Sequence, residues 1–313
     1  MSQLSLASVG SIGYALGCLR PIDQLEALSE KPESLAALRA KGVMYFSEAN
    51  KTPVELAVEA ASQTLAQSNA MPSEIEAVIY ASTSFWEKSF YSERDVAWLM
   101  NKLGLVNAYP VGIFLPGCAN AITSLRIAIN MIRAEGCRRI LVVTTDKASP
   151  SDSSKRIMWP DVSVLSDAAA SCIVTSSGDA EFDVVGVGSY SAPHMWDLDN
   201  KGNLAAFLLE TVRGAQKMAK FALLTSDLTP GTVNRLITNN YNHAVMKMIA
   251  WKCGFNEDQI FLDNVSRFAH AYAADTLINL HDCLAEQPAS SGDSFLLLGT
   301  GQKNWASAVL RKN

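Results

Sequence analysis

Cys118 stands where a predicted loop becomes a predicted helix, within FLPGCANAITSLRIAINMIRAEGCRRILVVTTD, residues 114–146. A free cysteine is usually a small buried hydrophobe. At the start of a helix, however, free amides and the helix dipole favour the thiolate, whose parent thiol has an ordinary pKa of about 8.5. The sequence therefore offers Cys118 as a candidate nucleophile, and the surrounding elements must supply its base.

Apolar periodicity alternates helix and buried strand along the chain. Residues 54–69 and 121–136 repeat apolar side chains at helical spacing. Residues 75–83 and 138–146 are short apolar runs, typical of strands that are covered on both faces. This order predicts an α/β protein with a mostly parallel sheet.

The alternation is also repeated. Residues 214–240 can be laid over the segment that starts at residue 57, with a constant offset of 158 residues. Any two helix–strand units look somewhat alike, which is the alternative explanation. A duplication predicts two halves, 1–175 and 176–313, related by a pseudo-twofold axis, with ligands held at the carboxyl ends of the strands.

The duplication suggests a base for Cys118. Residues 268–270 precede the helix of the second half that corresponds to the helix after Cys118. A pseudo-twofold axis would make the two places face one another, so that Cys118 and His270 form a nucleophile and base. His243 is a rival, because a later helix start would point it into the same site.

Composition narrows the class of protein. The 313 residues are 49% apolar and only 18% charged, which favours extra buried surface such as that of a homodimer. A net charge of −5 without a dense Lys/Arg run argues against nucleic acid or an anionic membrane as partner. The six cysteines form no CxxC pair, so neither a disulfide framework nor a zinc site is expected. Free cysteines are typical of a reducing compartment, so we expect a cytoplasmic location. No 18-residue apolar window predicts a membrane span.

Five ordered motifs carry a resemblance that runs nearly end to end. They read GCANAITSLRIAINMIRAEGCRRILVVTTDKAS, SVLSDAAASCIV, VNRLITNNYNHAVMKMIAWKCGF, LDNVSRFAHAYAADTLINL and LLLGTGQKNWASAVLRK. The chain resembles the type III β-ketoacyl-acyl-carrier-protein synthases of the thiolase superfamily. The resemblance implies a duplicated α/β/α/β/α five-layer fold, with Cys118 as the acylated cysteine.

The chain departs from the family pattern at the other polar positions. The family follows its cysteine with a His in His-Gln-x-Asn and then an Asn about thirty residues later. Here Asn239 occupies the His position, His270 the later Asn position, and Asn242 keeps the last Asn of the motif. A relocated histidine resembles the acyltransferase branch, which serves antibiotic and polyketide pathways. Some relatives place an Asp five residues after the His, as Asp275 is here.

The resemblance implies an acyl transfer. Cys118 would take an acyl group from an acyl-carrier-protein or coenzyme A thioester, and His270 would activate a hydroxyl or amine acceptor with help from Asn239 and Asp275. The amides of Cys118 and of the 299–301 loop would bind the thioester oxyanion. Two simpler interpretations stay open: Asp275 as an early-helix acid favoured by the dipole, and Asn239 as a turn residue.

The resemblance also predicts residues that contact the substrate. Phe85, Trp86 and Phe90 are predicted to line the acyl pocket or a dimer interface. Further predicted substrate-binding residues are Asn242, His243, Gly299 and Gly301. No organic cofactor or metal is implied, because GTG is too short for a phosphate loop and no ligand cluster has the right spacing. The rival functions are a carbon–carbon bond-forming 3-oxoacyl synthase and a non-catalytic partner subunit of one.

Overall fold

The computed structural model describes residues 5–83, 92–148, 153–158, 162–176, 178–198 and 202–313. Its strands are β1 (Ala7–Leu16), β2 (Cys18–Pro21), β3 (Tyr45–Glu48), β4 (Ala77–Ala81), β5 (Tyr109–Ile113), β6 (Arg139–Asp146), β7 (Ile157–Met158), β8 (Ser163–Val164), β9 (Ala168–Thr175), β10 (Phe182–Ser191), β11 (Arg235–Thr238), β12 (Ser294–Thr300) and β13 (Asn304–Lys312). Its α-helices are α1 (Glu26–Ser29), α2 (Pro32–Ala40), α3 (Pro53–Gln67), α4 (Ser92–Leu103), α5 (Asn120–Glu135), α7 (Leu204–Thr225), α8 (His243–Lys252), α9 (Asp263–Phe268) and α10 (Ala274–Glu286).

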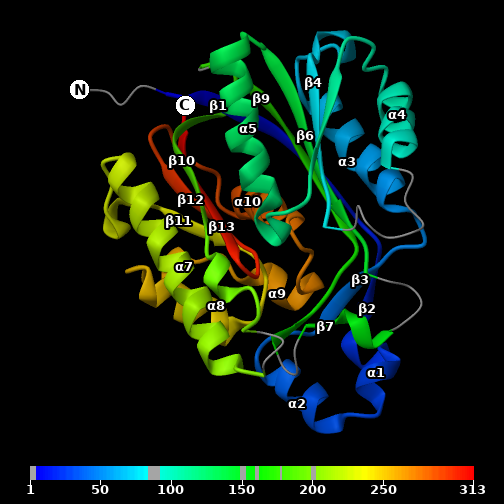
Figure 1. Ribbon diagram of the computed structural model, residues 1–313, viewed down its shortest axis with the longest axis vertical. Coiled ribbons are helices and arrows are strands. Elements are labelled where there is room, and N and C mark those ends of the chain that lie inside the picture. Colours follow the sequence, from blue (N-terminus) through cyan, green and yellow to red (C-terminus); the bar gives the residue numbers. More distant parts are fainter. Residues whose placement is uncertain (1–4, 84–91, 149–152, 159–161, 177, 199–201) are drawn as a thin grey trace.

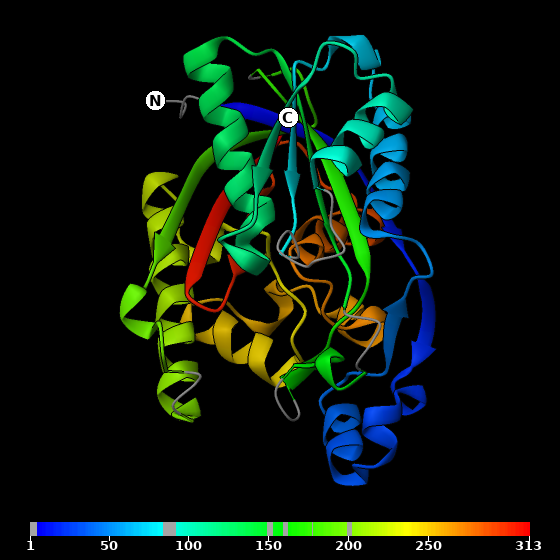
Figure 2. The same cartoon turned by 45° about the vertical axis from the view of Figure 1, so that its right-hand side comes forward.

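Five layers organise these elements. The two parts of the sheet enclose α5 and α10, while α3 and α4 cover the outer face of one part and α7 covers the outer face of the other (Figure 1). The view in Figure 2, turned by 45°, keeps the same arrangement, with α1 and α2 in a small lobe at the base. The largest cluster of buried apolar side chains surrounds α5 and α10. The central pair of helices is thus held by both halves of the chain.

The sheet is mixed, and the predicted mostly parallel pairing is wrong. Nine strands run in the order β11-β12-β13-β10-β1-β9-β6-β4-β5. Only β4 with β5, β4 with β6, and β11 with β12 pair in parallel among them. The other five pairings are antiparallel. Parallel pairs need a crossover, which here contains a helix, whereas short loops such as the one from β12 to β13 impose antiparallel pairing.

The predicted repeat is visible at the predicted offset. A 3₁₀ turn at Pro72–Glu74 leads into β4, and a 3₁₀ turn at Pro230–Thr232 leads into β11. Helices α3 and α7 precede these turns in the two halves. The halves meet where β1 pairs with β10, since β4, β5, β6 and β9 lie on one side of that junction and β11 to β13 on the other.

Local signals explain where the helices begin and end. Thr52 caps α3: its hydroxyl accepts from the amide of Glu55, and the Glu55 carboxylate accepts from the amide of Thr52 at 2.8 Å. Helix α5 ends at Gly136, whose φ of 77° is in the left-handed region that glycine adopts without strain. Gly136 thus marks the end of α5, the helix whose first residue directly follows the turn that carries Cys118.

Candidate active site

Cys118 lies in a one-turn 3₁₀ helix, Gly117–Ala119, that leads directly into α5. The turn is closed by two hydrogen bonds, from the amide of Gly117 to the carbonyl of Phe114 (3.1 Å) and from the amide of Ala119 to the carbonyl of Pro116 (3.2 Å). Gly117 has a φ of 60°, a conformation that a residue with a Cβ rarely adopts. The sequence thus presents the sulfur at the first turn of a central helix, as predicted.

His270 is held in a short segment between α9 and α10. Its amide donates to the carbonyl of Val164 (3.0 Å), and its carbonyl accepts from the amide of Ser166 (2.8 Å). Ala269 and Tyr272 on either side have positive φ values of 57° and 54°, which cost free energy for non-glycine residues. The bonds to the β8 region hold the imidazole in this strained segment.

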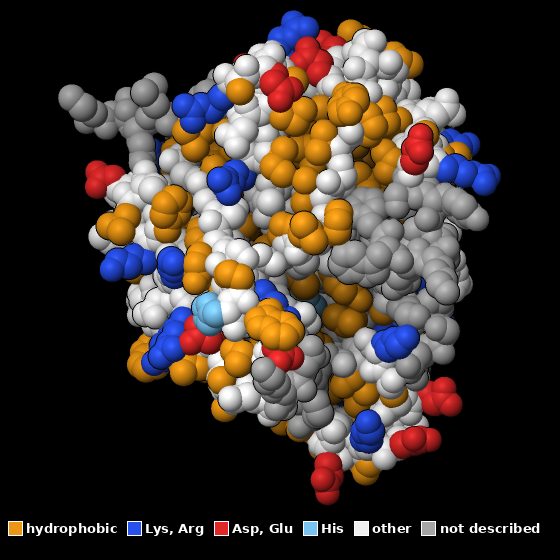
Figure 3. All heavy atoms as spheres, viewed as in Figure 1, with side chains coloured by type: hydrophobic (Ala, Val, Ile, Leu, Met, Phe, Trp, Pro, Cys, Tyr) orange, Lys and Arg blue, Asp and Glu red, His pale blue; other side chains and the backbone are white. Residues whose placement is uncertain are grey.

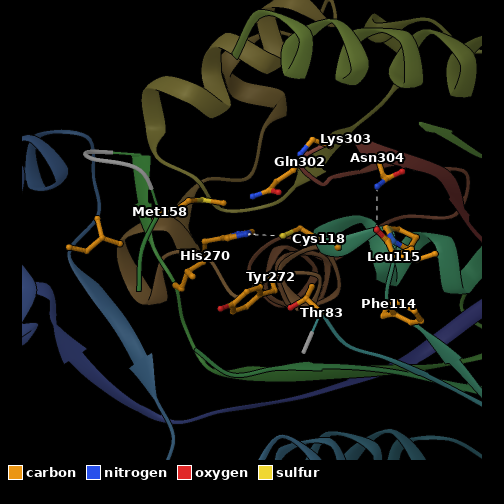
Figure 4. A pocket seen from close by; sticks show the side chains of 14 residues that line it. Thr83, Phe114, Leu115, Cys118, Met158, His270, Tyr272, Gln302, Lys303 and Asn304 are labelled. Carbon is orange, nitrogen blue, oxygen red and sulfur yellow. Dashed lines mark hydrogen bonds between the residues drawn. The ribbon is translucent and has the colours of Figure 1, made fainter. Parts of the chain in front are cut away.

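The structure brings Cys118, His270 and Asp275 together in a line. The Sγ of Cys118 lies 3.3 Å from Nε2 of His270 (Figure 4). On the other side of the ring, Nδ1 of His270 lies 2.5 Å from Oδ2 of Asp275, in the first turn of α10. Both His270 and Asp275 are fully buried. This is the connectivity of a nucleophile–histidine–acid triad.

The partners of Asp275 determine which tautomer His270 adopts. Besides His270, the carboxylate accepts from the amide of Asn240 (2.8 Å), the amide of Ala271 (2.7 Å) and the side-chain Nδ2 of Asn240 (3.3 Å). Burial raises the pKa of Asp275 above its ordinary value, although the charge of the neighbouring imidazolium opposes this rise. These amide groups only donate, so a proton on the carboxyl could be accepted only by Nδ1 of His270. Because the pKa of His270 is raised to about 10, the ring keeps that proton and Asp275 is ionised. The proton is then on Nδ1 of His270.

The same charges determine the protonation of His270. Burial alone lowers the pKa of His270, but the charge of Asp275 and that of the Cys118 thiolate together raise it to about 10. At neutral pH the imidazole is therefore protonated when it faces a thiolate.

A chain of buried amides supports the triad from behind. Nδ2 of Asn279 donates to Oδ1 of Asn240 (2.7 Å) and to the carbonyl of Thr238 (2.8 Å), while Oδ1 of Asn279 accepts from Nδ2 of Asn264 (2.9 Å). Asn279 lies on α10 one turn after Asp275 and is fully buried. It thereby fixes Asn240, which in turn donates twice to Asp275.

We expect Asn279→Leu to lower the rate of acyl transfer about tenfold, equivalent to one lost hydrogen bond, because Asn240 loses the partner that orients it. The pH profile of the rate should shift as well, since Asp275 controls the pKa of His270. Steady-state rates between pH 5 and 10 measure both effects. A lower melting temperature with an unchanged pH profile would restrict Asn279 to a structural role.

Asn239 is near the nucleophile, but its amide is turned toward backbone groups. Its Oδ1 accepts from the amide of Thr300 (2.8 Å), which fixes the orientation of the carboxamide. Its Nδ2 donates to the carbonyls of Tyr272 (2.8 Å) and Cys118 (3.3 Å). Asn239 therefore connects three segments by hydrogen bonds: the turn that carries Cys118 (Gly117–Ala119, the nucleophile turn), the His270 segment and the end of β12.

Gly299 and Gly301 let β12 approach the nucleophile turn closely. A Cβ on Gly299 would lie 3.1 Å from Cα of Ala119, and one on Gly301 would lie 2.5 Å from the carbonyl oxygen of Pro116. The amide of Gly301 donates to the carbonyl of Asn304 (2.7 Å). With the Thr300 amide bonded to Asn239, both of these loop amides have partners, so an oxyanion site there stays a prediction that requires a rearrangement.

A cavity of about 520 Å³ opens onto the sulfur. It is lined by Thr83, Phe114, Leu115, Pro116, Gly117, Cys118, Ile157, Met158, Leu165, His270, Tyr272, Gln302, Lys303 and Asn304. Figure 4 shows Tyr272 and Thr83 on one side of the sulfur and Gln302 and Lys303 on the other. Sequence reasoning missed Tyr272, although it lies only two residues after His270, and it missed Thr83. The walls are mainly apolar, as is typical of sites that bind small organic molecules.

Two of the predicted substrate contacts, Asn242 and His243, do not line this cavity. Asn242 caps α8: its Oδ1 accepts from the amide of Val245 (3.0 Å), and its Nδ2 donates to the carbonyl of Val162 (2.7 Å). The ring of His243 packs against Gly42, where a Cβ would lie 2.4 Å from Cε1. The predicted wall residues Phe85, Trp86 and Phe90 lie outside the described residues.

In the described ranges, no group of three or more His, Cys, Asp or Glu side chains is arranged to hold a metal ion. None of the helices among the described residues is long and apolar enough to cross a bilayer.

The fold is that of a thiolase-like α/β protein, and its cavity holds a cysteine beside a buried histidine. Two family models, both describing 3-oxoacyl-[acyl-carrier-protein] synthase III, match residues 115–192 and 223–312, together more than half of the chain. The chain therefore belongs to the 3-oxoacyl-[acyl-carrier-protein] synthase III family of the thiolase superfamily, a family of condensing enzymes and transferases.

The matches to individual relatives extend over most of the chain, but the sequence identities are low. The β-ketoacyl-[acyl-carrier-protein] synthase III of Aquifex aeolicus is 24% identical over 272 residues, which are 83% of this chain and 84% of the relative. The solved structure of the acyltransferase ChlB3 superposes with a TM-score of 0.85 at 18% identity, covering 97% of each chain. Cerulenin-bound OleA of Xanthomonas campestris superposes with a TM-score of 0.82 at 16% identity, covering 98% of this chain and all of that one. At these identities the solved structures bear on the fold alone.

Proposed function

We propose that the protein is an acyltransferase that carries an acyl group on Cys118 and delivers it to a hydroxyl or amine. The observation that carries this proposal is the line from Cys118 Sγ to His270 Nε2 (3.3 Å) and from His270 Nδ1 to Asp275 Oδ2 (2.5 Å). The donor would be an acyl-carrier-protein or coenzyme A thioester, as is typical of the family.

In the first half-reaction the thiolate of Cys118 attacks the carbonyl carbon of the donor thioester. A carbon–sulfur bond to Cys118 forms, and the bond to the donor sulfur breaks. The departing thiolate takes the proton from Nε2 of His270, which leaves a neutral imidazole. The ionised Asp275 keeps the other proton on Nδ1 throughout.

In the second half-reaction His270 acts as a base. Acylation removes the negative charge of the Cys118 sulfur, one of the charges that raise the pKa of His270. The pKa of His270 falls, so that Nε2 stays neutral and can take the proton of an acceptor O–H or N–H. The acceptor oxygen or nitrogen attacks the acyl carbon, Cys118 departs as a thiolate, and the proton stays on Nε2 of His270, which restores the starting pair.

The orientation of Asn239 supports transfer over condensation. Decarboxylative condensation needs donors aimed at a thioester carbonyl that becomes an enolate. Nδ2 of Asn239 is engaged by two backbone carbonyls, and only His270 offers a donor to the cavity from the two exchanged positions. We infer that the second donor of a condensing site is missing here.

A carbon–carbon bond-forming synthase is the second candidate. It is favoured by the family models, which describe a 3-oxoacyl synthase. A protonated His270 beside the sulfur can still donate to one thioester carbonyl, in a malonyl condensation or in joining two acyl chains. The two candidates differ in whether a malonyl group keeps its carboxylate on the enzyme.

We also propose that the protein acts in the cytoplasm, in polyketide- or fatty-acid-derived specialised metabolism. We propose further that it forms a homodimer. Strand β5 is an edge of the sheet and is largely exposed, as are Val106 and Tyr109 beside and within it. Figure 3 shows hydrophobic side chains gathered between the positions of α5 and α4 in Figure 1. An exposed edge strand with apolar neighbours fits pairing with a second copy, which sedimentation measures.

Intact-mass measurement after exposure to acetyl, longer acyl and malonyl thioesters tests the proposal. Wild-type protein should gain the mass of one acyl group, and Cys118→Ala should gain none.

Cys283→Ala is the matched control, because Cys283 is also a free cysteine but is buried. This variant should gain the acyl group as the wild type does. A malonyl adduct that keeps its carboxylate favours acyl transfer. An adduct that arrives as acetyl would favour the synthase, and no adduct from any donor would favour a non-catalytic partner subunit.

A further inference from the structure

Five polar atoms behind the nucleophile are buried without a hydrogen-bond partner in the described structure. They are Nδ2 and Oδ1 of Asn120, Oγ of Ser124, Oγ1 of Thr144 and Oδ2 of Asp146. All four residues are at most 1% exposed. Buried polar atoms in native proteins are nearly always paired with protein or with ordered water, so this cluster needs an explanation.

The four side chains face a common space between α5 and β6. Asn120 and Ser124 are one turn apart on α5. Ile122, between them in sequence, contacts the site of Gly299 in β12 on the opposite side of the helix, where its Cδ1 lies 3.3 Å from a Cβ built on that glycine. Asn120 and Ser124 are therefore turned toward the half of the sheet that contains β6, which contacts α5.

Strand β6 presents the other two residues to the same space. Thr145 points away, since its hydroxyl donates to the carbonyl of Pro53 (2.8 Å). Thr144 and Asp146 alternate with it and continue the face of Val142, which packs in the central cluster around α5. The start of α5 and the end of β6 lie at the same end of the sheet, because α5 leads from β5 back to β6 and both strands run parallel to β4.

Asp146 joins this space to the catalytic cavity. Its Oδ1 accepts from the amide and the hydroxyl of Thr83, both at 2.6 Å, and from the hydroxyl of Ser82 at 3.2 Å. Thr83 lines the cavity that opens onto Cys118. Burial raises the pKa of Asp146 to about 7, and the hydrogen bonds from Thr83 oppose that rise. Oδ2 is left to the space that Asn120, Ser124 and Thr144 face.

We propose that the first turn of α5 and the end of β6 enclose ordered water that bridges Oδ2 of Asp146 to Asn120, Ser124 and Thr144. Water both donates and accepts, which suits a set that contains a carboxylate oxygen, two hydroxyls and an amide. A monovalent cation would suit the oxygens but would leave Nδ2 of Asn120 unpaired. The chemistry of the set therefore favours water.

Such water would tie the nucleophile turn to the cavity wall. Asn120 is two residues after Cys118, and Asp146 holds Thr83, so the bridge connects the two sides of the cavity through the interior. The ordered water does not depend on an acyl substrate. If the water is absent, the proposed acyl transfer still stands, and if acyl transfer is not observed, the proposed water site still stands.

A crystal structure at about 1.5 Å resolution is the deciding measurement. Density for a water molecule within hydrogen-bonding distance of Oδ2 of Asp146 and of at least one of the other three side chains supports the proposal. Direct side-chain contact with no water overturns it. An anomalous rubidium peak at this place after a rubidium soak also overturns it, in favour of a cation.

Paired substitutions on β6 give a second, solution measurement. Thr145→Val removes a hydroxyl that has a protein partner and should lower the melting temperature by about 2 °C. If water binds the hydroxyl of Thr144, Thr144→Val should lower the melting temperature by a similar amount, because the water loses a partner. In a dry space the valine would replace an unpaired hydroxyl. An unchanged or raised melting temperature for Thr144→Val would therefore contradict the proposal.

Discussion

Replacing His270 with alanine is expected to slow acyl transfer by about 100- to 10,000-fold, the usual contribution of a positioned general acid and base. Alkylation of Cys118 by iodoacetamide at pH 7 should slow as well. The reason is that an ordinary thiol without a cationic partner is only a few per cent ionised at that pH. Alkylation needs no acyl donor, so the effect on the nucleophile is measured separately from the effect on transfer.

His243→Ala is the matched control for this experiment. Sequence reasoning left His243 as a rival base, whereas the structure packs its ring against Gly42 and away from the cavity. The control should alkylate and transfer at close to the wild-type rates. The assignment of His270 fails if His243→Ala slows alkylation as strongly as His270→Ala, or if His270→Ala leaves the rate unchanged.

The pairing of Cys118 with His270 could be predicted because it depends on backbone topology. A constant offset between the two halves indicates a pseudo-twofold relation, which brings the starts of two corresponding helices together whatever the side chains are. The thiolase-like fold was predicted from the family resemblance that ordered motifs carry along nearly the whole chain, and the comparisons confirm it. Strand direction was not, because apolar runs read the same in either direction.

The roles of individual polar side chains could not be obtained in this way. Asn239 occupies a motif position, but the direction of its carboxamide depends on Thr300, sixty-one residues away in sequence. In the sequence, Thr83 and Asp146 are only the last residues of two predicted buried strands. In the structure the two strands are neighbours, and the hydroxyl of Thr83 donates to Oδ1 of Asp146. Such contacts follow from register and packing, and one sequence does not reveal them.

Asp275→Asn is expected to reduce acyl transfer by about 100- to 10,000-fold with little change in the position of the imidazole, because it changes the tautomer of His270. The asparagine offers one acceptor oxygen where the carboxylate now receives donors from Asn240, Ala271 and His270. If its amide nitrogen faces the ring, it donates to Nδ1 of His270. The ring proton then moves to Nε2 and the base toward Cys118 is lost.

The pKa of His270 provides the distinguishing readout. The charge of Asp275 helps to raise that pKa to about 10 against the lowering effect of burial, so removing the charge lowers it. The imidazolium, which wild type keeps up to about pH 10, should be lost at a lower pH in Asp275→Asn. Histidine titration by NMR, with His270→Ala used to assign the signal, measures this shift.

Asp263→Asn is the matched control for the simpler interpretation of Asp275 as an early-helix acid. Asp263 is in the first turn of α9 but exposed, so it shares the favourable position near a helix start without the contact to His270. If Asp275 only stabilised its helix, the two variants would lower the melting temperature alike and leave the His270 titration unchanged. A triad instead requires that only Asp275→Asn moves the pKa of His270 and the rate of transfer together.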